Sequence, residues 1–120
     1  MSYFYVAMTI LLTVYGQIAL KWQVGAAGAP PADWPGRARF LGALLAQPVV
    51  LSALAAAFGA ALCWMLAISR LELSHAYPFV SLSFVLVLAL SAVFFGEPVS
   101  WEKVLGVTLI VAGVAVSSRG

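Results

Sequence analysis

The stretch "LSHAYPFVSLSFVLVLALSAVFFGEPVS", Leu73 to Ser100, is apolar enough to span a bilayer, yet both of its ends are polar. It begins with a Tyr-Pro pair followed by two serines and closes on Glu-Pro. A transmembrane helix needs about 20 mainly apolar residues, each adding about 1.5 Å along its axis. The stretch therefore predicts a transmembrane helix, and its polar ends need a role beyond anchoring.

The composition of the whole chain agrees with a membrane location. Of the 120 residues, 64% are hydrophobic and 8% are charged, which is too little polar surface to cover a water-soluble globule of this size. The first apolar segment has no early Lys or Arg and runs for a full span, so we expect it to be retained rather than cleaved as a signal. The single Cys63 supports neither a disulfide nor a metal site. We predict an integral membrane protein without cofactor or metal, and without a soluble domain for catalysis.

Four segments are predicted to cross the membrane, namely residues 3–24, 48–69, 75–95 and 99–117. The predicted fold is an all-α membrane protein with four transmembrane helices in a single domain, residues 1–120. Residues 25–40 are rich in Gly, Pro and charge, and are predicted to form a loop. The short apolar segment that follows cannot cross alone, and we expect an interfacial helix that turns at Pro48.

Four crossings place both termini on one side of the membrane. Counting Lys and Arg by side gives Lys21, Arg37, Arg39 and Lys103 opposite the termini, and Arg70 and Arg119 with them. Because cytoplasmic loops carry an excess of Lys and Arg, the sequence predicts, by a small margin, that the termini lie outside. The net charge of +2, without a basic stretch interleaved with aromatics, does not indicate nucleic-acid binding.

The first helix carries a polar stripe. Thr9, Thr13, Gln17 and Lys21 recur every fourth residue, so they lie near one helix face. Polar groups within hydrocarbon need partners, and one interpretation is that the stripe lines a hydrated cavity. In the other, the threonines bond to their own helix, Gln17 clasps a neighbouring helix and Lys21 anchors the helix at the headgroups.

The second helix is rich in small residues. Ala55 with Gly59 and Ala56 with Ala60 are pairs four residues apart that allow close helix approach. We expect this helix to be a packing surface. Trp64 either lines a pocket or fills an interface, and the sequence leaves both open.

The ends of the third helix are the most informative. Pro78 disfavours a helical conformation at the residue before it, so Tyr77 is expected to be extended or distorted. Tyr77 and Ser81 are one turn apart on one face. Glu97, at the other end, is predicted on the same membrane side as Lys21. The alternative role of Glu97 is to stabilise the start of the fourth helix through its negative charge.

Several motifs together identify a family. The pattern "GVTLIVAGV", preceded by "FFGEPVS", together with "YGQIALK" in the first helix, resembles the small multidrug resistance branch of the drug/metabolite transporter superfamily. Within it, "AYPFVSLSFV" followed by "EPVS" is more similar to the small subunits that flip undecaprenyl-phosphate-linked aminoarabinose. The resemblance implies a four-helix protein of the bacterial inner membrane that works as a homodimer or as a heterodimer with a related small subunit. Gly106 and Gly113 share one face of the fourth helix, and we expect them to form the dimer seam.

The chain departs from the drug exporters at one position. Those exporters carry a membrane-embedded glutamate three residues before the glycine that matches Gly16, and here that residue is Thr13. A cation/proton exchanger needs such a carboxylate. Export of small cations or quaternary ammonium compounds is therefore disfavoured, but it stays an alternative hypothesis. A third hypothesis is a helper protein that transports nothing and only stabilises a partner.

The resemblance implies a polyprenyl-phosphate-linked sugar as substrate, moved from the cytoplasmic to the outer leaflet. The sugar and phosphate need a polar interior and a cation, while the polyprenyl tail of the substrate stays among the membrane lipids. We expect Lys21 to bind phosphate, and Glu97 to pair with an aminosugar cation or to steady Lys21. The complete set of expected substrate-binding residues is Lys21, Gln17, Thr13, Tyr77, Ser81, Glu97 and Trp64.

Overall fold

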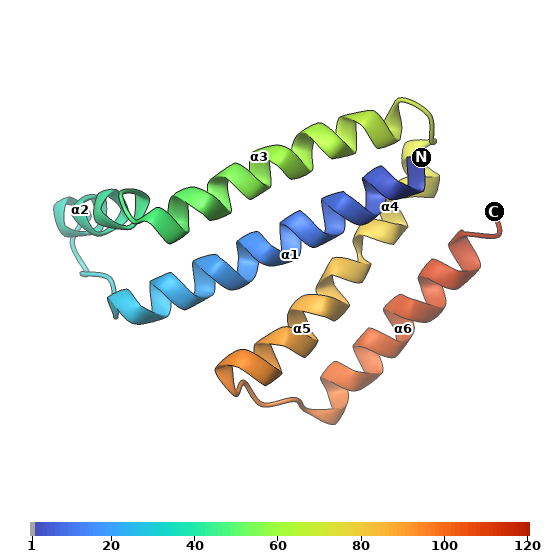
Figure 1. Ribbon diagram of the computed structural model, residues 1–120. Helices are drawn as coiled ribbons and strands as arrows, with labels where there is room; N and C mark the ends of the chain where they lie inside the picture. Colours follow the sequence, from blue (N-terminus) through green and yellow to red (C-terminus); the bar gives the residue numbers. More distant parts are fainter. Residues whose placement is uncertain (1) are drawn as a thin grey trace.

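A computed structural model describes residues 2–120, and throughout that range the regular elements are helices (Figure 1). In chain order they are α1 (Ser2–Ala27), α2 (Trp34–Leu45), α3 (Pro48–Ile68), α4 (Leu73–Val80), α5 (Leu82–Phe95) and α6 (Trp101–Ser117). The all-α prediction is confirmed for this part of the chain.

Three helical segments of the described chain are long and apolar enough to cross a membrane. They are Ser2–Ala27, Pro48–Ile68 and, with α4 and α5 taken together, Leu73–Phe95. α6 is apolar but shorter, with 17 residues. Many large apolar side chains on these helices face outward, which suits a surface surrounded by lipid rather than water. The chain is a multi-pass membrane protein.

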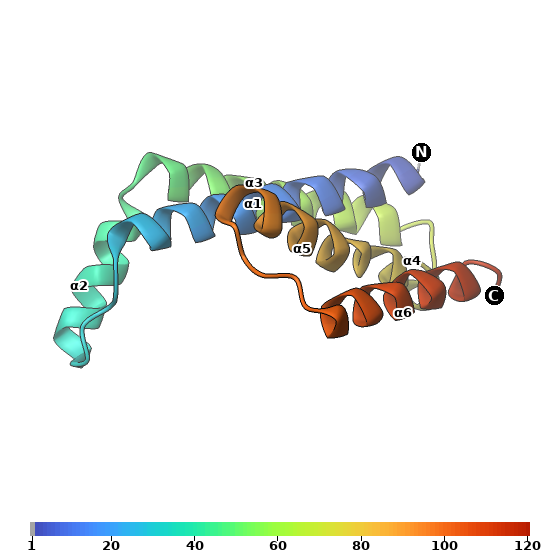
Figure 2. The ribbon, with the colours of Figure 1, turned by 90° about the horizontal axis from the view of Figure 1, so that it is seen from below.

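α1 and α3 lie side by side along most of their length (Figures 1 and 2). Small residues allow this close approach, because a Cβ added at Gly16 would lie 3.4 Å from the carbonyl oxygen of Ala53. Ala56 and Ala60 are buried at the same interface, whereas Ala55 is exposed. The prediction that the small residues of this helix serve packing is confirmed for the buried pair.

α5 packs on α1 as well, and α6 contacts only α4 and α5 among the described residues. Val114 is the one residue of α6 that is buried. At Gly106 and Gly113 an added Cβ would meet no other atom within 4 Å. One face of α6 is therefore open for a partner or for lipid.

The connection after α1 is shorter than the predicted loop over 25–40. α1 continues to Ala27 and α2 begins at Trp34, so only residues 28–33 lie between them. The cap explains the early start of α2: Asp33 accepts a hydrogen bond from the backbone N–H of Gly36, at 3.2 Å, and a proline follows in the first turn. The predicted loop was too long because its Gly, Pro and charged residues are typical of loops, although α2 begins within it.

The third predicted span consists of two helices, and the distortion lies at Ser81 rather than at Tyr77. The prediction for Tyr77 was wrong, since this residue is helical. Pro78 has no N–H to donate, and the chain adjusts one turn later: the Ser81 N–H donates to the Pro78 carbonyl and the Phe84 N–H to the Ser81 carbonyl, both at 3.1 Å. These tighter bonds separate α4 from α5.

Both termini lie at the same end of the helices, and the connections that follow α1 and α5 lie at the other (Figure 1). This arrangement brings residues near the end of α1 close to the connection between α5 and α6. The candidate site is built there.

Candidate functional site

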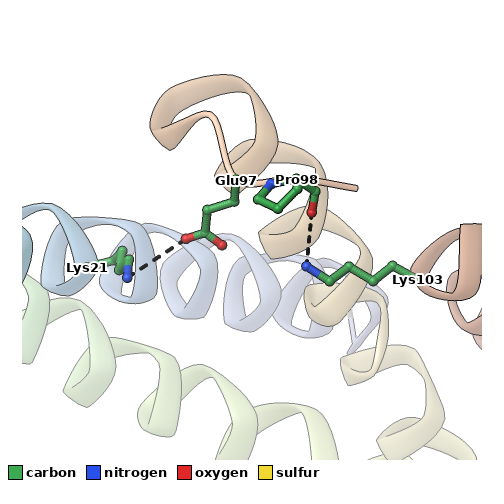
Figure 3. Close-up of polar contacts among 4 residues, drawn as sticks. All are labelled: Lys21, Glu97, Pro98 and Lys103. Atoms are coloured by element: carbon green, nitrogen blue, oxygen red, sulfur yellow. Dashed lines mark hydrogen bonds and ion pairs between the residues drawn. The ribbon is translucent and has the colours of Figure 1, made fainter. Parts of the chain in front are cut away.

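Lys21 and Glu97 meet where α1 passes the connection between α5 and α6 (Figure 3). The Nζ atom of Lys21 lies 3.9 Å from Oε1 of Glu97, and the two side chains are 60% and 40% exposed. Lys103 lies on the other side of this connection, where its ammonium donates to the Pro98 carbonyl at 3.0 Å. Two cations and one carboxylate thus gather at one end of the molecule.

The local sequence explains why Glu97 has this position. Gly96 ends α5 in the left-handed conformation, with φ of 64°, and its N–H bonds to the Ser91 carbonyl, a helix ending that favours glycine. Ser100 then caps α6 by accepting from the Lys103 N–H at 3.2 Å. Glu97 therefore stands in the connection, outside the first turn of α6, where Glu102 is the acidic residue.

The ion pair is weak enough to exchange partners. A surface pair between long side chains contributes about 0–1 kcal/mol to stability, because both charges remain hydrated and the side chains lose entropy. The fold does not depend on a contact of this kind. A ligand that brings both an anionic and a cationic group can therefore separate Lys21 from Glu97 at little cost.

A second feature, which we call the polar crevice, lies between α1, α3 and α4. It has a volume of about 280 Å³ and is lined by Thr9, Thr13, Ala57, Ala60, Ala61, Trp64, Tyr77 and Val80. The rings of Trp64 and Tyr77 meet edge to face, with centroids 5.9 Å apart. Trp64 also packs against the buried cluster of the core, so it both lines a pocket and fills an interface. The crevice offers hydroxyl groups beside two aromatic rings.

The polar stripe of α1 divides among different environments. Thr9 also lines the polar crevice, but it is buried and its hydroxyl donates to the Tyr5 carbonyl of its own helix at 2.8 Å, as the packing interpretation expects. Thr13 lines the polar crevice, and the Gln17 side chain is exposed. Lys21 forms the ion pair at the end of the stripe.

The expected substrate-binding residues thus fall into two groups. Thr13, Trp64 and Tyr77 meet at the polar crevice, and Lys21 and Glu97 meet at the ion pair. The remaining two stand apart. Ser81 directs its hydroxyl to the Pro78 carbonyl of its own helix, and Gln17 is one turn from Thr13 in one direction and one turn from Lys21 in the other.

Two interhelical hydrogen bonds involve residues to which the sequence assigned no role. The Tyr3 hydroxyl and Nε2 of His75 are 2.9 Å apart, and both rings pack edge to face on Phe79. The Tyr15 hydroxyl lies 2.7 Å from Oγ of Ser52. The position of Tyr3 at a helix end is typical of the aromatic belt at the membrane interface, which was the available signal.

Comparisons with known proteins place these features in context. The chain matches the model of the EamA-like transporter family over residues 1–119. A relative from Pseudomonas aeruginosa (strain LESB58), described as probable 4-amino-4-deoxy-L-arabinose-phosphoundecaprenol flippase subunit ArnE, is 38% identical over 116 residues, which cover 92% of this chain and 91% of the relative. No solved structure matches the chain.

Relatives with a second subunit name are also similar to this chain. A protein from Pseudomonas fluorescens described as probable 4-amino-4-deoxy-L-arabinose-phosphoundecaprenol flippase subunit ArnF is 36% identical, over 92% of this chain and 83% of the relative. In Aeromonas salmonicida the ArnF subunit is again 36% identical, over 96% of this chain and 77% of the relative.

Proposed function

The chain belongs to the EamA-like transporter family, and we propose that it is a small flippase subunit that moves a polyprenyl-phosphate-linked sugar, with aminoarabinose as the first candidate, between the leaflets of the bacterial inner membrane. The observation that carries the proposal is the exposed Lys21–Glu97 pair at one end of the helices. The names of the relatives support the substrate class.

The charges of the pair complement an aminosugar phosphate. The phosphate is anionic and the amino group is cationic, so Lys21 binds the first and Glu97 the second. Their mutual contact, at 3.9 Å, holds both side chains near the positions that a bound headgroup would need. The ligand exchanges one weak pair for two charge-assisted contacts.

The polar crevice serves the sugar as it crosses. Thr13 and Tyr77 replace water around the sugar hydroxyls, and Trp64 offers a flat face against which a sugar ring packs. Gln17 stands between the ion pair and the crevice, whereas the Ser81 hydroxyl donates to the Pro78 carbonyl and would have to turn from it to reach the sugar. Movement runs from the cytoplasmic leaflet outward, with the chain termini outside.

No covalent bond changes in this process, so the protein acts as a transporter and not as an enzyme. The positions of the acidic residues support this choice over cation/proton exchange. Asp33, Glu72, Glu97 and Glu102 are the four carboxylates of the sequence, and each lies at a helix end or in a connection. An embedded carboxylate of the kind that such exchange needs is missing from the sequence.

The functional unit is a dimer, with a second copy or a related small subunit as partner. α6 is the fourth crossing of the single domain formed by residues 1–120, and its Gly106 and Gly113 face the partner. The open surface at both glycines supports this arrangement. The description of similar relatives as flippase subunits, under two subunit names, is consistent with a paired chain.

The test is a leaflet-accessibility assay in vesicles. The chain is reconstituted alone and with a related small subunit, and a polyprenyl-phosphate aminosugar is added to one leaflet. We expect the aminosugar to become accessible on the opposite side in at least one of the two preparations. If neither preparation moves the lipid while the chain protects cells from quaternary ammonium compounds, cation export replaces the proposal.

A further inference from the structure

An apolar crevice lies at the end of α1 that carries Lys21. Its volume is about 440 Å³, and its chief lining residues are Tyr15, Ile18 and Trp22 of α1, Val49 of α3, and Phe94 and Phe95 of α5. This volume falls within the range of about 300–1,000 Å³ that is usual for small-molecule sites. The aromatic rings come from two different helices, so the crevice is built by tertiary packing and not by one helix face.

The crevice is open at its side. α1 lies between α3 and α5 (Figure 1), and it contacts both, whereas α3 and α5 make no close backbone contact with each other among the described residues. The space between them is therefore bounded by side chains alone. In a membrane this opening faces lipid, so a long hydrocarbon chain can enter from the bilayer without passing through water.

The crevice and the ion pair are built from the same two segments. Trp22 directly follows Lys21, and Phe95 precedes Glu97 by two residues. Ile18, which also lines the crevice, is one turn before Lys21 and near the same face of α1, so an amphiphile whose phosphate binds Lys21 can place the first part of its hydrocarbon chain in the crevice. The volume accommodates only a part of a long polyprenyl chain, and the remainder stays in the bilayer.

Shape, and not hydrophobicity, decides what occupies the crevice. A hydrocarbon chain gains no hydrophobic free energy when it leaves lipid for protein, because lipid tails are as apolar as the side chains. Dispersion contacts remain, and they depend on close fit. The methyl branches and double bonds of an isoprenoid make it stiffer and wider than a straight acyl chain, so rigid aromatic walls can distinguish the two.

We propose that the apolar crevice binds the isoprenoid segment next to the phosphate and selects a polyprenyl chain over a straight one. The inference rests on the proposed function, because it takes the phosphate to be bound at Lys21. The protein would then recognise the isoprenoid chain of the lipid as well as its headgroup.

The test measures binding rather than flipping. Polyprenyl monophosphate without a sugar, and a straight-chain alkyl phosphate of equal carbon number, are titrated against the full chain in lipid nanodiscs. We expect the native chain to bind the polyprenyl form about tenfold more tightly, the scale of one well-packed aromatic contact. Phe94→Ala should lose this preference, because it removes one wall of the crevice.

Phe84→Ala is the matched control. Phe84 and Phe94 lie on the same helix and are 59% and 65% exposed, but Phe84 does not line the crevice, so its variant should keep the preference. Val49→Phe, which fills the crevice from the opposite wall, should reduce it as Phe94→Ala does.

Equal binding of the two phosphates by the native chain, or equal effects of Phe94→Ala and Phe84→Ala, would overturn the inference. The inference would also be overturned if Phe94→Ala altered dimerisation but kept the preference for the polyprenyl phosphate. The crevice would then be a contact between two copies of the protein. The proposed function fails separately: a chain that shows the preference but moves no polyprenyl-phosphate aminosugar in vesicles supports this inference and contradicts flipping.

Discussion

At the scale of single residues, the Lys21–Glu97 pair suits transport because it is weak. Its atoms are 3.9 Å apart and both side chains remain substantially exposed, so the pair contributes little to folding. A transporter has to release its substrate as well as bind it. A site whose charges neutralise each other when empty, and which opens when phosphate arrives, meets both needs without leaving an unpaired charge at the membrane surface.

Thr13 allows the flippase and exchanger hypotheses to be separated with one substitution. By the resemblance to drug exporters, Thr13 is expected to occupy the position of their glutamate, and it lines the polar crevice. On the flippase account it contributes one hydrogen bond, worth about 0.5–1.5 kcal/mol, so Thr13→Ala should reduce flipping by about tenfold at most. The rate of leaflet exchange in vesicles is the measurement. Complete loss of flipping in a variant that folds normally would contradict the account.

At the scale of helices, local hydrogen bonds decided what hydropathy alone did not predict. Long apolar segments predicted α1 and α3 closely, because their length follows from membrane thickness. The start of α2 depends on the cap at Asp33, which lies in a stretch of loop-like composition. The break at Ser81 depends on how the chain compensates for Pro78, and proline alone indicates a disturbance without its position.

The candidate site was predictable to a similar degree. Counting membrane crossings was enough to place Lys21 and Glu97 on one side, and the structure brings them together. Tyr77, expected at the opposite end of the third span from Glu97, lies at the polar crevice beside Trp64. Its contact with Trp64 depends on how α4 packs against α3, which helix periodicity does not specify. The aromatic walls of the apolar crevice come from distant segments and had no signal in the sequence.

α6 carries a prediction at the same scale. Because Gly113 has open space where a side chain would be, Gly113→Leu leaves the monomer fold intact and obstructs a partner helix at this seam. In mild detergent we expect the native chain to run as a dimer and the variant to run as a monomer. Native mass spectrometry of the two proteins gives the answer. A dimer that persists in the variant would show that the interface lies elsewhere.

At the scale of the whole molecule, α1 is linked at both ends to the segment formed by α4 and α5. The Tyr3–His75 hydrogen bond lies near the chain termini, and the Lys21–Glu97 pair lies at the opposite end. The polar crevice is between these links, and the apolar crevice is beside the second. The charged pair, the apolar crevice beside it and the polar crevice further along α1 are separate surfaces that suit the phosphate, the polyprenyl tail and the sugar of such a lipid.

Whether Lys21 binds the phosphate is best tested by measuring how a polyprenyl-phosphate sugar binds to reconstituted Lys21→Met. A charge-assisted contact is worth about 1.5–3 kcal/mol, so affinity should fall by about tenfold to a hundredfold, and flipping should fall with it. Lys21→Arg should retain more binding, because a cation remains although its geometry changes. Lys103→Met is the matched control, since the Lys103 ammonium bonds to a backbone carbonyl and not to Glu97, and it should lose less. If Lys21→Met folds normally and both binds and flips the lipid as well as the native chain, Lys21 only anchors α1 at the headgroups and the account is wrong.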